Sequence, residues 1–179
     1  ERIRSDPDAR LFSVSQNDWH GYCTCAKCKA VDDAEESHAG TLVLMINRVA
    51  EAVEKEFPDV LVESLAYQYT RSPPKSIKPR HNVLIRLCTI ECSYIQPLDG
   101  EQNREFATDI EGWSKLAEHL VIWDYTTNYN DYLGPHPNLR VLGPNVRYFV
   151  KNGAVGLFEE GEGDDFCELK YWLLMRLMW

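Results

Sequence analysis

The chain has 179 residues, of which 44% are hydrophobic and 26% charged, and its formal net charge is −9. This composition is ordinary for a globular protein with a sizeable core, and the acidic balance argues against a protein that binds the phosphate backbone of nucleic acids. No apolar run reaches the roughly 20 residues of a membrane-spanning helix. The charged opening residues 1–10 predict no signal peptide, and six cysteines are too few for a disulfide-dense small protein.

Residues 1–91 are predicted to form three strands and one helix. In chain order, the pattern predicts a strand at 10–15, a helix at 40–57, a strand at 59–67, a proline-rich loop at 71–80 and a strand at 82–91. The helix is indicated by Leu42, Ile46 and Val49, which recur at helical spacing, and Pro58 ends it.

Residues 92–179 continue the alternation of helices and strands. The pattern predicts a helix at 103–118, a strand at 120–125, a loop at 131–144, a short helix at 145–152 that Gly153 ends, a strand at 154–158 and a helix at 166–179. The strands are apolar without alternation, which is typical of a parallel sheet buried on both faces. Trp113, Trp172 and Trp179 fall on the predicted helices and are expected in the core.

Two α/β architectures fit this order, a doubly wound open sheet and a (β/α) barrel. No glycine-rich phosphate loop follows any strand, which weakens the nucleotide-binding open sheet. Polar residues follow every strand, and barrel enzymes carry their chemistry at that rim. A full barrel needs eight units and roughly 250 residues, so we predict a single domain, 1–179, made of the last five units (strands 4–8) of a TIM-like barrel. The missing N-terminal part of the barrel, or self-association, would complete it.

The pair Asn17-Asp18 follows the first predicted strand. Glycoside hydrolysis needs a proton donor and a second group that stabilises the oxocarbenium-like centre. For an N-acetylhexosamine, the substrate's own acetamide can be the nucleophile if a polar side chain orients it. We therefore expect Asn17 as the orienting residue and Asp18 as the acid/base. A helix N-cap or an Asx-turn is the alternative interpretation.

Two further acids are candidates because each follows a predicted strand. Glu91 could be the acid/base or a ligand of sugar hydroxyls, and the alternative is an ion pair with Arg86 in the same strand. Glu159 directly follows residues 154–158 and is a candidate ligand-binding residue, with a role in bracing the loop as the alternative. Glu160 and Glu162 are expected to be solvated loop charges.

Aromatic side chains gather at the strand ends, and sugar rings have apolar faces that pack on them. These residues are Trp19, Tyr67, Tyr69, Trp123 and Tyr125. Tyr67 and Trp123 are the expected walls of a sugar subsite, with Trp19 as a further contact and the neighbouring Asp124 as a hydroxyl ligand. The alternative is ordinary packing in the core or at the rim.

Cys23, Cys25 and Cys28 form a C-x-C-x-x-C pattern just after the Asn17-Asp18 pair. A zinc site needs four ligands, and no second pair at matching spacing follows, so the zinc pattern is incomplete. A redox C-x-x-C would need a thioredoxin-like unit that nothing else indicates. We expect these cysteines to brace the loop. They could do so through a structural metal such as zinc, through a disulfide, or as free thiols, and a role in catalysis stays open as a further alternative.

Several segments together resemble one bacterial family. They are FSVSQNDW, C-x-C-x-x-C, AGTL, LAYQYTRSPPK, RLCTIEC, IWDYTTN, PNLRVLGPNVRYF and GLFEEGE. The family was long catalogued as a domain of unknown function, is abundant in gut Bacteroides-type bacteria, and is related to α-glucuronidase-like and hexosaminidase-like barrels. The resemblance runs in chain order over nearly the whole chain.

The resemblance implies a glycoside hydrolase that acts on N-acetylhexosamine-containing glycans, because some members are endo-β-N-acetylglucosaminidases. It implies acetamide assistance with retention, an Asn-Asp pair at the end of the fourth barrel strand, no required cofactor, and a periplasmic, cell-surface or secreted location. Two alternatives stay open. Removal of uronic acids would use basic residues, for which Arg71 and Arg86 are candidates, and a carbohydrate-binding barrel fragment would have no activity.

Overall fold

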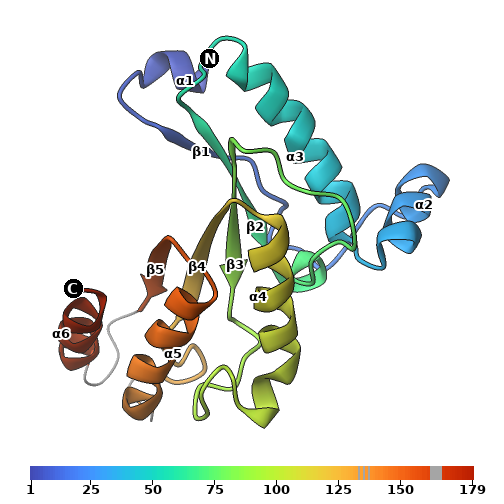
Figure 1. Ribbon diagram of the computed structural model, residues 1–179. Helices are drawn as coiled ribbons and strands as arrows, with labels where there is room; N and C mark the ends of the chain where they lie inside the picture. The colour runs from blue at the N-terminus through green and yellow to red at the C-terminus, as the bar shows by residue number, and fades with distance from the viewer. Residues whose placement is uncertain (133, 135, 137, 162–166) are drawn as a thin grey trace.

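The protein is built on five parallel strands that form one sheet in the order β1-β2-β3-β4-β5. The computed structural model describes residues 1–132, 134, 136, 138–161 and 167–179. The strands are β1 (Leu11–Ser13), β2 (Leu61–Ala66), β3 (Val83–Cys88), β4 (His119–Tyr125) and β5 (Gly156–Glu160). The sheet curls into half of a barrel and alternates with helices (Figure 1). This is the partial (β/α) barrel that the sequence predicts.

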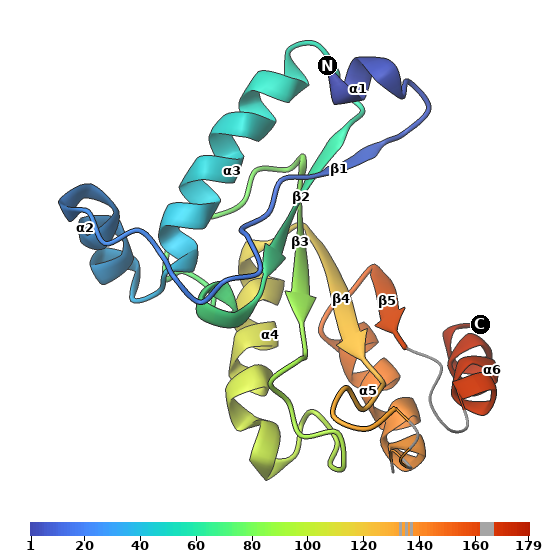
Figure 2. The ribbon, with the colours of Figure 1, turned by 180° about the vertical axis from the view of Figure 1, so that it is seen from behind.

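Helices alternate with the strands, and some of them cover one face of the sheet. They are α1 (Arg2–Ser5), α2 (Ala26–Glu35), α3 (Ala39–Glu54), α4 (Arg104–Leu116), α5 (Leu139–Lys151) and α6 (Cys167–Met178), with 3-10 turns at Gln68–Thr70 and Glu101–Asn103. The covering layer consists of α3, α4 and α5, while α6 lies beside α5 at the β5 edge (Figures 1 and 2). Within the described residues, no helix is long and apolar enough to cross a membrane.

Alternate residues of each strand point to opposite faces of the sheet. Ile85 and Leu87 of β3 and Ile122 of β4 pack with Phe106 and Trp113 of α4 in the main core. The residues between them point to the other face, which no helix of the covering layer crosses (Figure 2). We call the first side the helix-covered face and the second the concave face. Because the register is parallel throughout, all strands end at the same edge.

The helix α5 begins six residues earlier than the sequence predicts. Residues 139–144 are helical rather than part of a loop, although Pro144 lies inside the helix. A proline within a helix costs about 3 kcal/mol. Burial of Val141 and Leu142 in this first part of the helix offsets that cost. The predicted stop is confirmed, since Gly153 follows the helix with φ +79°, which favours glycine.

The sequence pattern does not predict the helix α2, because its residues form no apolar face. Its buried residues are two acids, Asp32 and Glu35. The Asp32 carboxylate accepts hydrogen bonds from the backbone and hydroxyl of Thr41, and Glu35 accepts bonds from Ser76. Buried polar anchors hold α2 in place, and hydrophobic periodicity cannot reveal such anchors.

The tryptophans on helices divide into two environments. Trp113 is fully buried, as predicted, and its indole N–H donates to the backbone oxygen of Arg71 at 2.7 Å. The prediction was wrong for Trp172, which is 60% exposed, and for the terminal Trp179, which is fully exposed. The helix α6 packs on α5 through Leu174 instead.

Candidate functional site

A cleft of about 350 Å³ opens on the concave face at the carboxyl ends of the strands. Loops or strand ends from all five strands contribute to its lining, as expected where parallel strands end at one edge. We call it the rim cleft. Its lining residues are Asp18, Leu65, Tyr67, Ile90, Trp123, Tyr125, Tyr129 and Glu160. The cleft therefore combines aromatic walls with two carboxylates.

Asp18 reaches the rim cleft from the loop that follows β1. The Tyr67 hydroxyl donates to its carboxylate at 3.1 Å, and the Gln68 side-chain amide lies at 3.5 Å. Burial, followed by the Asp18 carboxylate, raises the pKa of Tyr67 to about 12. Tyr67 therefore keeps its proton at neutral pH and remains a donor to Asp18. The sequence singled out both residues, and the fold brings them together.

Glu160 is the second carboxylate of the rim cleft, although the sequence pattern does not single it out. Trp123 Nε1 donates to it at 2.5 Å, and the Tyr129 hydroxyl also donates to it. The interpretation of Glu160 as a solvated loop charge was wrong because β5 extends to residue 160. In the parallel register, Glu160 pairs with Tyr125, so the period of two places both on the concave face. Glu162 lies outside the described residues.

Asn17 and Trp19, predicted to orient the acetamide and to contact the sugar, lie outside the rim cleft. Asn17 is exposed, and its backbone oxygen accepts a bond from the Trp19 amide at 2.8 Å. Trp19 is 70% exposed, and its indole folds back over Gly21, where a Cβ would come within 2.4 Å of Nε1. Trp19 thus packs on its own loop, not on the aromatic walls.

Asp124 and Glu159, both predicted to contact the sugar, lie on the helix-covered face and not in the rim cleft. They are register partners on β4 and β5. Asp124 is buried and accepts a bond from the Thr89 hydroxyl at 2.6 Å. Burial raises the pKa of Asp124 to about 6. Glu159 has buried carboxylate oxygens without a hydrogen-bond partner in the described part of the chain, and burial together with Asp124 raises its pKa to about 9.

The ion pair between Glu91 and Arg86, the alternative interpretation of Glu91, is not formed. Arg86 points to the concave face, where it binds Glu63 at 2.5 Å and lies 5.5 Å from the centroid of the Trp123 ring. Glu91 lies beyond the end of β3 and binds Arg71 at 3.3 Å. The predicted strand ran to residue 91, whereas β3 ends at residue 88 and the following turn carries Glu91 away from the strand. Glu91 does not line the rim cleft.

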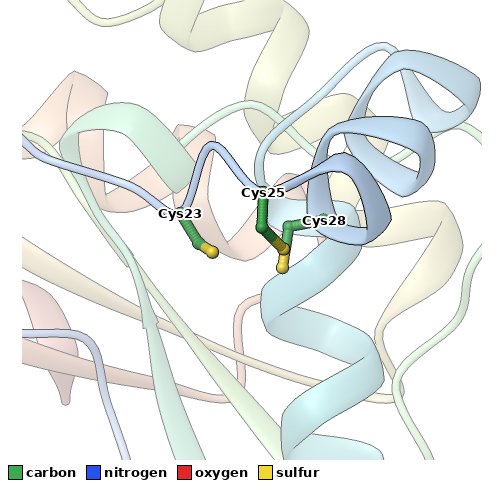
Figure 3. A group of neighbouring side chains, drawn as sticks. All are labelled: Cys23, Cys25 and Cys28. Atoms are coloured by element: carbon green, nitrogen blue, oxygen red, sulfur yellow. The ribbon is translucent and has the colours of Figure 1, made fainter.

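The three cysteines lie together where the loop that carries Asp18 meets α2. Cys23 is in the loop, Cys25 caps α2 and Cys28 lies in its first turn (Figure 3). Their sulfur atoms are all within 4.8 Å of one another, and all three thiols are free. Hydrogen bonds from the backbone N–H of Cys28, then from neighbouring thiols and the N–H of Lys27, lower the pKa of Cys25 to about 7.

The fold and the rim cleft define a partial (β/α) barrel that carries polar and aromatic side chains at its carboxyl edge. The chain belongs to a family described as a domain of unknown function, DUF4838, whose family model matches residues 1–179. No curated protein matches the chain, and no solved structure does. Family membership therefore assigns no activity, and any function has to be argued from the rim cleft.

Proposed function

We propose that the protein is a glycoside hydrolase that cleaves β-linked N-acetylhexosamine residues within glycans, with retention of configuration. The observation that carries the proposal is the rim cleft, in which aromatic side chains and the carboxylates of Asp18 and Glu160 meet at the carboxyl edge of a parallel half-barrel. The resemblance of the sequence to a family with endo-β-N-acetylglucosaminidase members points to the same chemistry.

The aromatic walls suit a sugar ring. Trp123 and Tyr125 are stacked, with ring centroids 5.9 Å apart and an angle of 10° between their planes. Such rings offer flat apolar surface to the C–H faces of a pyranose. Glu160, held by Trp123 and Tyr129, would accept hydrogen bonds from sugar hydroxyls. The walls would thus bind the ring and Glu160 would set its orientation.

Asp18 would act as the acid/base. As an acid it would give its proton to the glycosidic oxygen while the bond from C1 to that oxygen breaks, and the acetamide oxygen of the substrate would attack C1 to form a bicyclic oxazolinium. As a carboxylate it would then take a proton from the water that attacks C1 and reopens the ring. Tyr67 would orient Asp18. Two displacements at C1 give retention.

The uronic acid alternative receives less support. It needs a cation that can bind a substrate carboxylate, and the two candidate arginines already have acidic partners. Arg71 binds Asp109 at 2.7 Å as well as Glu91, and Arg86 binds Glu63. An N-acetylhexosaminide, which is neutral, does not need such a cation.

The test is release of glycan from an N-glycoprotein by the complete natural protein and its variants. Asp18→Asn is expected to lower kcat/KM by about 100-fold or more, as loss of a general acid does. Glu91→Gln, outside the rim cleft, and Glu111→Gln, exposed on α4, are expected to stay within about threefold of the parent. Equal activity of Asp18→Asn and the parent would refute the role of Asp18.

A binding measurement separates hydrolysis from simple recognition. Calorimetry with an N-acetylglucosamine oligosaccharide should show binding that Trp123→Ala weakens about tenfold, in line with the loss of one aromatic contact. If the folded protein binds the oligosaccharide but releases no product from any N-acetylhexosaminide, hydrolysis is excluded and the carbohydrate-binding barrel replaces it.

A further inference from the structure

The three cysteines at the junction of α2 with the loop that precedes it form a compact group. Cys23 approaches from the loop, while Cys25 and Cys28 approach from the first turn of α2, and the side chains converge (Figure 3). All three sulfur atoms lie within 4.8 Å of one another. Four-coordinate zinc with Zn–S bonds of about 2.3 Å separates its sulfurs by roughly 3.8 Å. The observed grouping is therefore close to the spacing of thiolate ligands on one ion.

The backbone around Cys25 also suits a metal thiolate. Cys25 is the N-cap residue of α2 and has an extended ψ of 154°, which places it next to the free backbone N–H groups of the first helical turn. Backbone donors at a helix N-terminus stabilise negative charge on sulfur. The C-x-x-C turn is thus shaped before any ion binds, and Cys23 supplies a third sulfur from outside the turn.

The cluster is anchored to the helix layer on its far side. The Thr41 hydroxyl of α3 lies 3.3 Å from the backbone oxygen of Cys28 and 2.5 Å from the Asp32 carboxylate. The same Asp32 binds Nδ1 of His38 at 2.8 Å, and His38 and Cys23 line one cavity of about 230 Å³. The position of Cys28 is therefore fixed by α3, while Cys23 belongs to the loop that carries Asp18.

We propose that Cys23, Cys25 and Cys28 bind one Zn²⁺ ion that fastens the loop between β1 and α2 to the helix layer. Thiolates favour soft or borderline ions such as zinc. Cys23 and Cys25 are exposed, so a water molecule can complete the coordination. A disulfide would use two of the three sulfurs and leave the third without a role, whereas one ion uses all of them. This inference is independent of the proposed hydrolysis.

The first experiment measures zinc in the complete natural protein, purified without chelators and without a histidine tag. Mass spectrometry of the metal content should find about one zinc per chain. Cys23→Ser, Cys25→Ser and Cys28→Ser should each lower that content at least tenfold. Cys167→Ser, at the start of α6, is the matched control and should keep it. Zinc retained in all three cluster variants would overturn the proposal.

A second experiment does not depend on the folding of any variant. The unaltered protein is alkylated with iodoacetamide under non-reducing conditions, with and without a chelator, and the modified cysteines are mapped by peptide mass spectrometry. The proposal predicts that Cys23, Cys25 and Cys28 are protected together and become reactive together when zinc is removed. A disulfide between two of them, or three thiols that react equally fast without the chelator, would refute it.

The proposed role of the ion predicts a local effect that activity does not report. Removal of zinc should make residues 14–25 at least tenfold more susceptible to limited proteolysis, while cleavage elsewhere stays unchanged. Restoring zinc, but not magnesium, should restore protection, because magnesium prefers oxygen ligands. If chelation removes stoichiometric zinc and leaves proteolysis of this loop unchanged, the ion does not fasten the loop.

Discussion

The two faces of the sheet place the same kinds of residues in opposite environments. On the helix-covered face, Asp124 is buried and the carboxylate oxygens of Glu159 are buried, and this burial raises the pKa of both. Trp123 and Glu160, the sequence neighbours of these two acids, lie on the concave face. They are hydrogen-bonded to each other and line the rim cleft. One step along a strand separates a buried acid from an acid held in an open cleft. The contrast teaches that the strand period, not sequence proximity, selects the candidate site.

The largest expected effect on stability comes from truncating a tryptophan, and the two sides of the sheet should differ in how much stability is lost. Trp113→Ala removes a fully buried ring of the helix-covered face and should lower the free energy of unfolding by about 3–5 kcal/mol. Trp123→Ala removes a half-buried ring of the concave face and should cost about 1–2 kcal/mol. Urea unfolding measures both. Equal losses would show that the concave face is as tightly packed as the core.

A matched pair of acids around Arg71 gives the next effect. Asp109 and Glu105 both accept bonds from its guanidinium, but the Asp109 side chain is 6% exposed and that of Glu105 is 93% exposed. Asp109→Ala should lower stability by about 3 kcal/mol because it leaves a buried charge without its nearest partner. Glu105→Ala should change stability by less than about 0.5 kcal/mol. Thermal unfolding of the two variants decides whether burial controls the strength of these bonds.

The raised pKa of Glu159 predicts a pH dependence. The folded state holds the proton up to about pH 9, whereas an unfolded glutamate releases it near pH 4.3. The folded state therefore binds more protons in this window, so stability is full below it and falls as pH rises through it, by up to about 1.4 kcal/mol per pH unit. Asp124, raised to about 6, acts in the same direction at lower pH.

Glu159→Gln should remove the part of this decline that lies between about pH 6 and pH 9, because glutamine does not titrate. Unfolding in urea at pH 5, 7 and 8.5 measures the slope, with the exposed Glu111→Gln as control. A variant whose stability declines as steeply as that of the parent would show that Glu159 is ionised in the folded protein.

A small stability effect is expected in the rim cleft, at Glu160. Its carboxylate is half-buried and accepts from Trp123 and Tyr129, so Glu160→Gln keeps one acceptor oxygen and should cost about 0.5–1 kcal/mol. Binding of an N-acetylglucosamine oligosaccharide should nevertheless weaken several-fold. Glu159→Gln, one residue away, should leave that binding unchanged. Weaker binding in both variants would contradict the assignment of the two acids to different faces.

The sequence by itself determined the order of elements and the class of fold. Apolar strands alternating with amphipathic helices indicate a parallel sheet, because parallel strands need crossover connections and these are usually helices. The same reasoning located Asp18, Tyr67 and Trp123 at the carboxyl edge, since residues that follow parallel strands gather there. These features depend on local periodicity, which a sequence records directly.

Only the tertiary structure decided which residue at each strand end enters the rim cleft. Whether β5 ends at residue 158 or 160 chooses between Glu159 and Glu160, and the end of β3 decides whether Glu91 meets Arg86 or Arg71. Strand ends are set by hydrogen bonds between neighbouring strands and by loop contacts distant in sequence. The position of α2, held by Asp32 and Glu35, likewise depends on partners elsewhere in the chain, and such partners leave no periodic pattern.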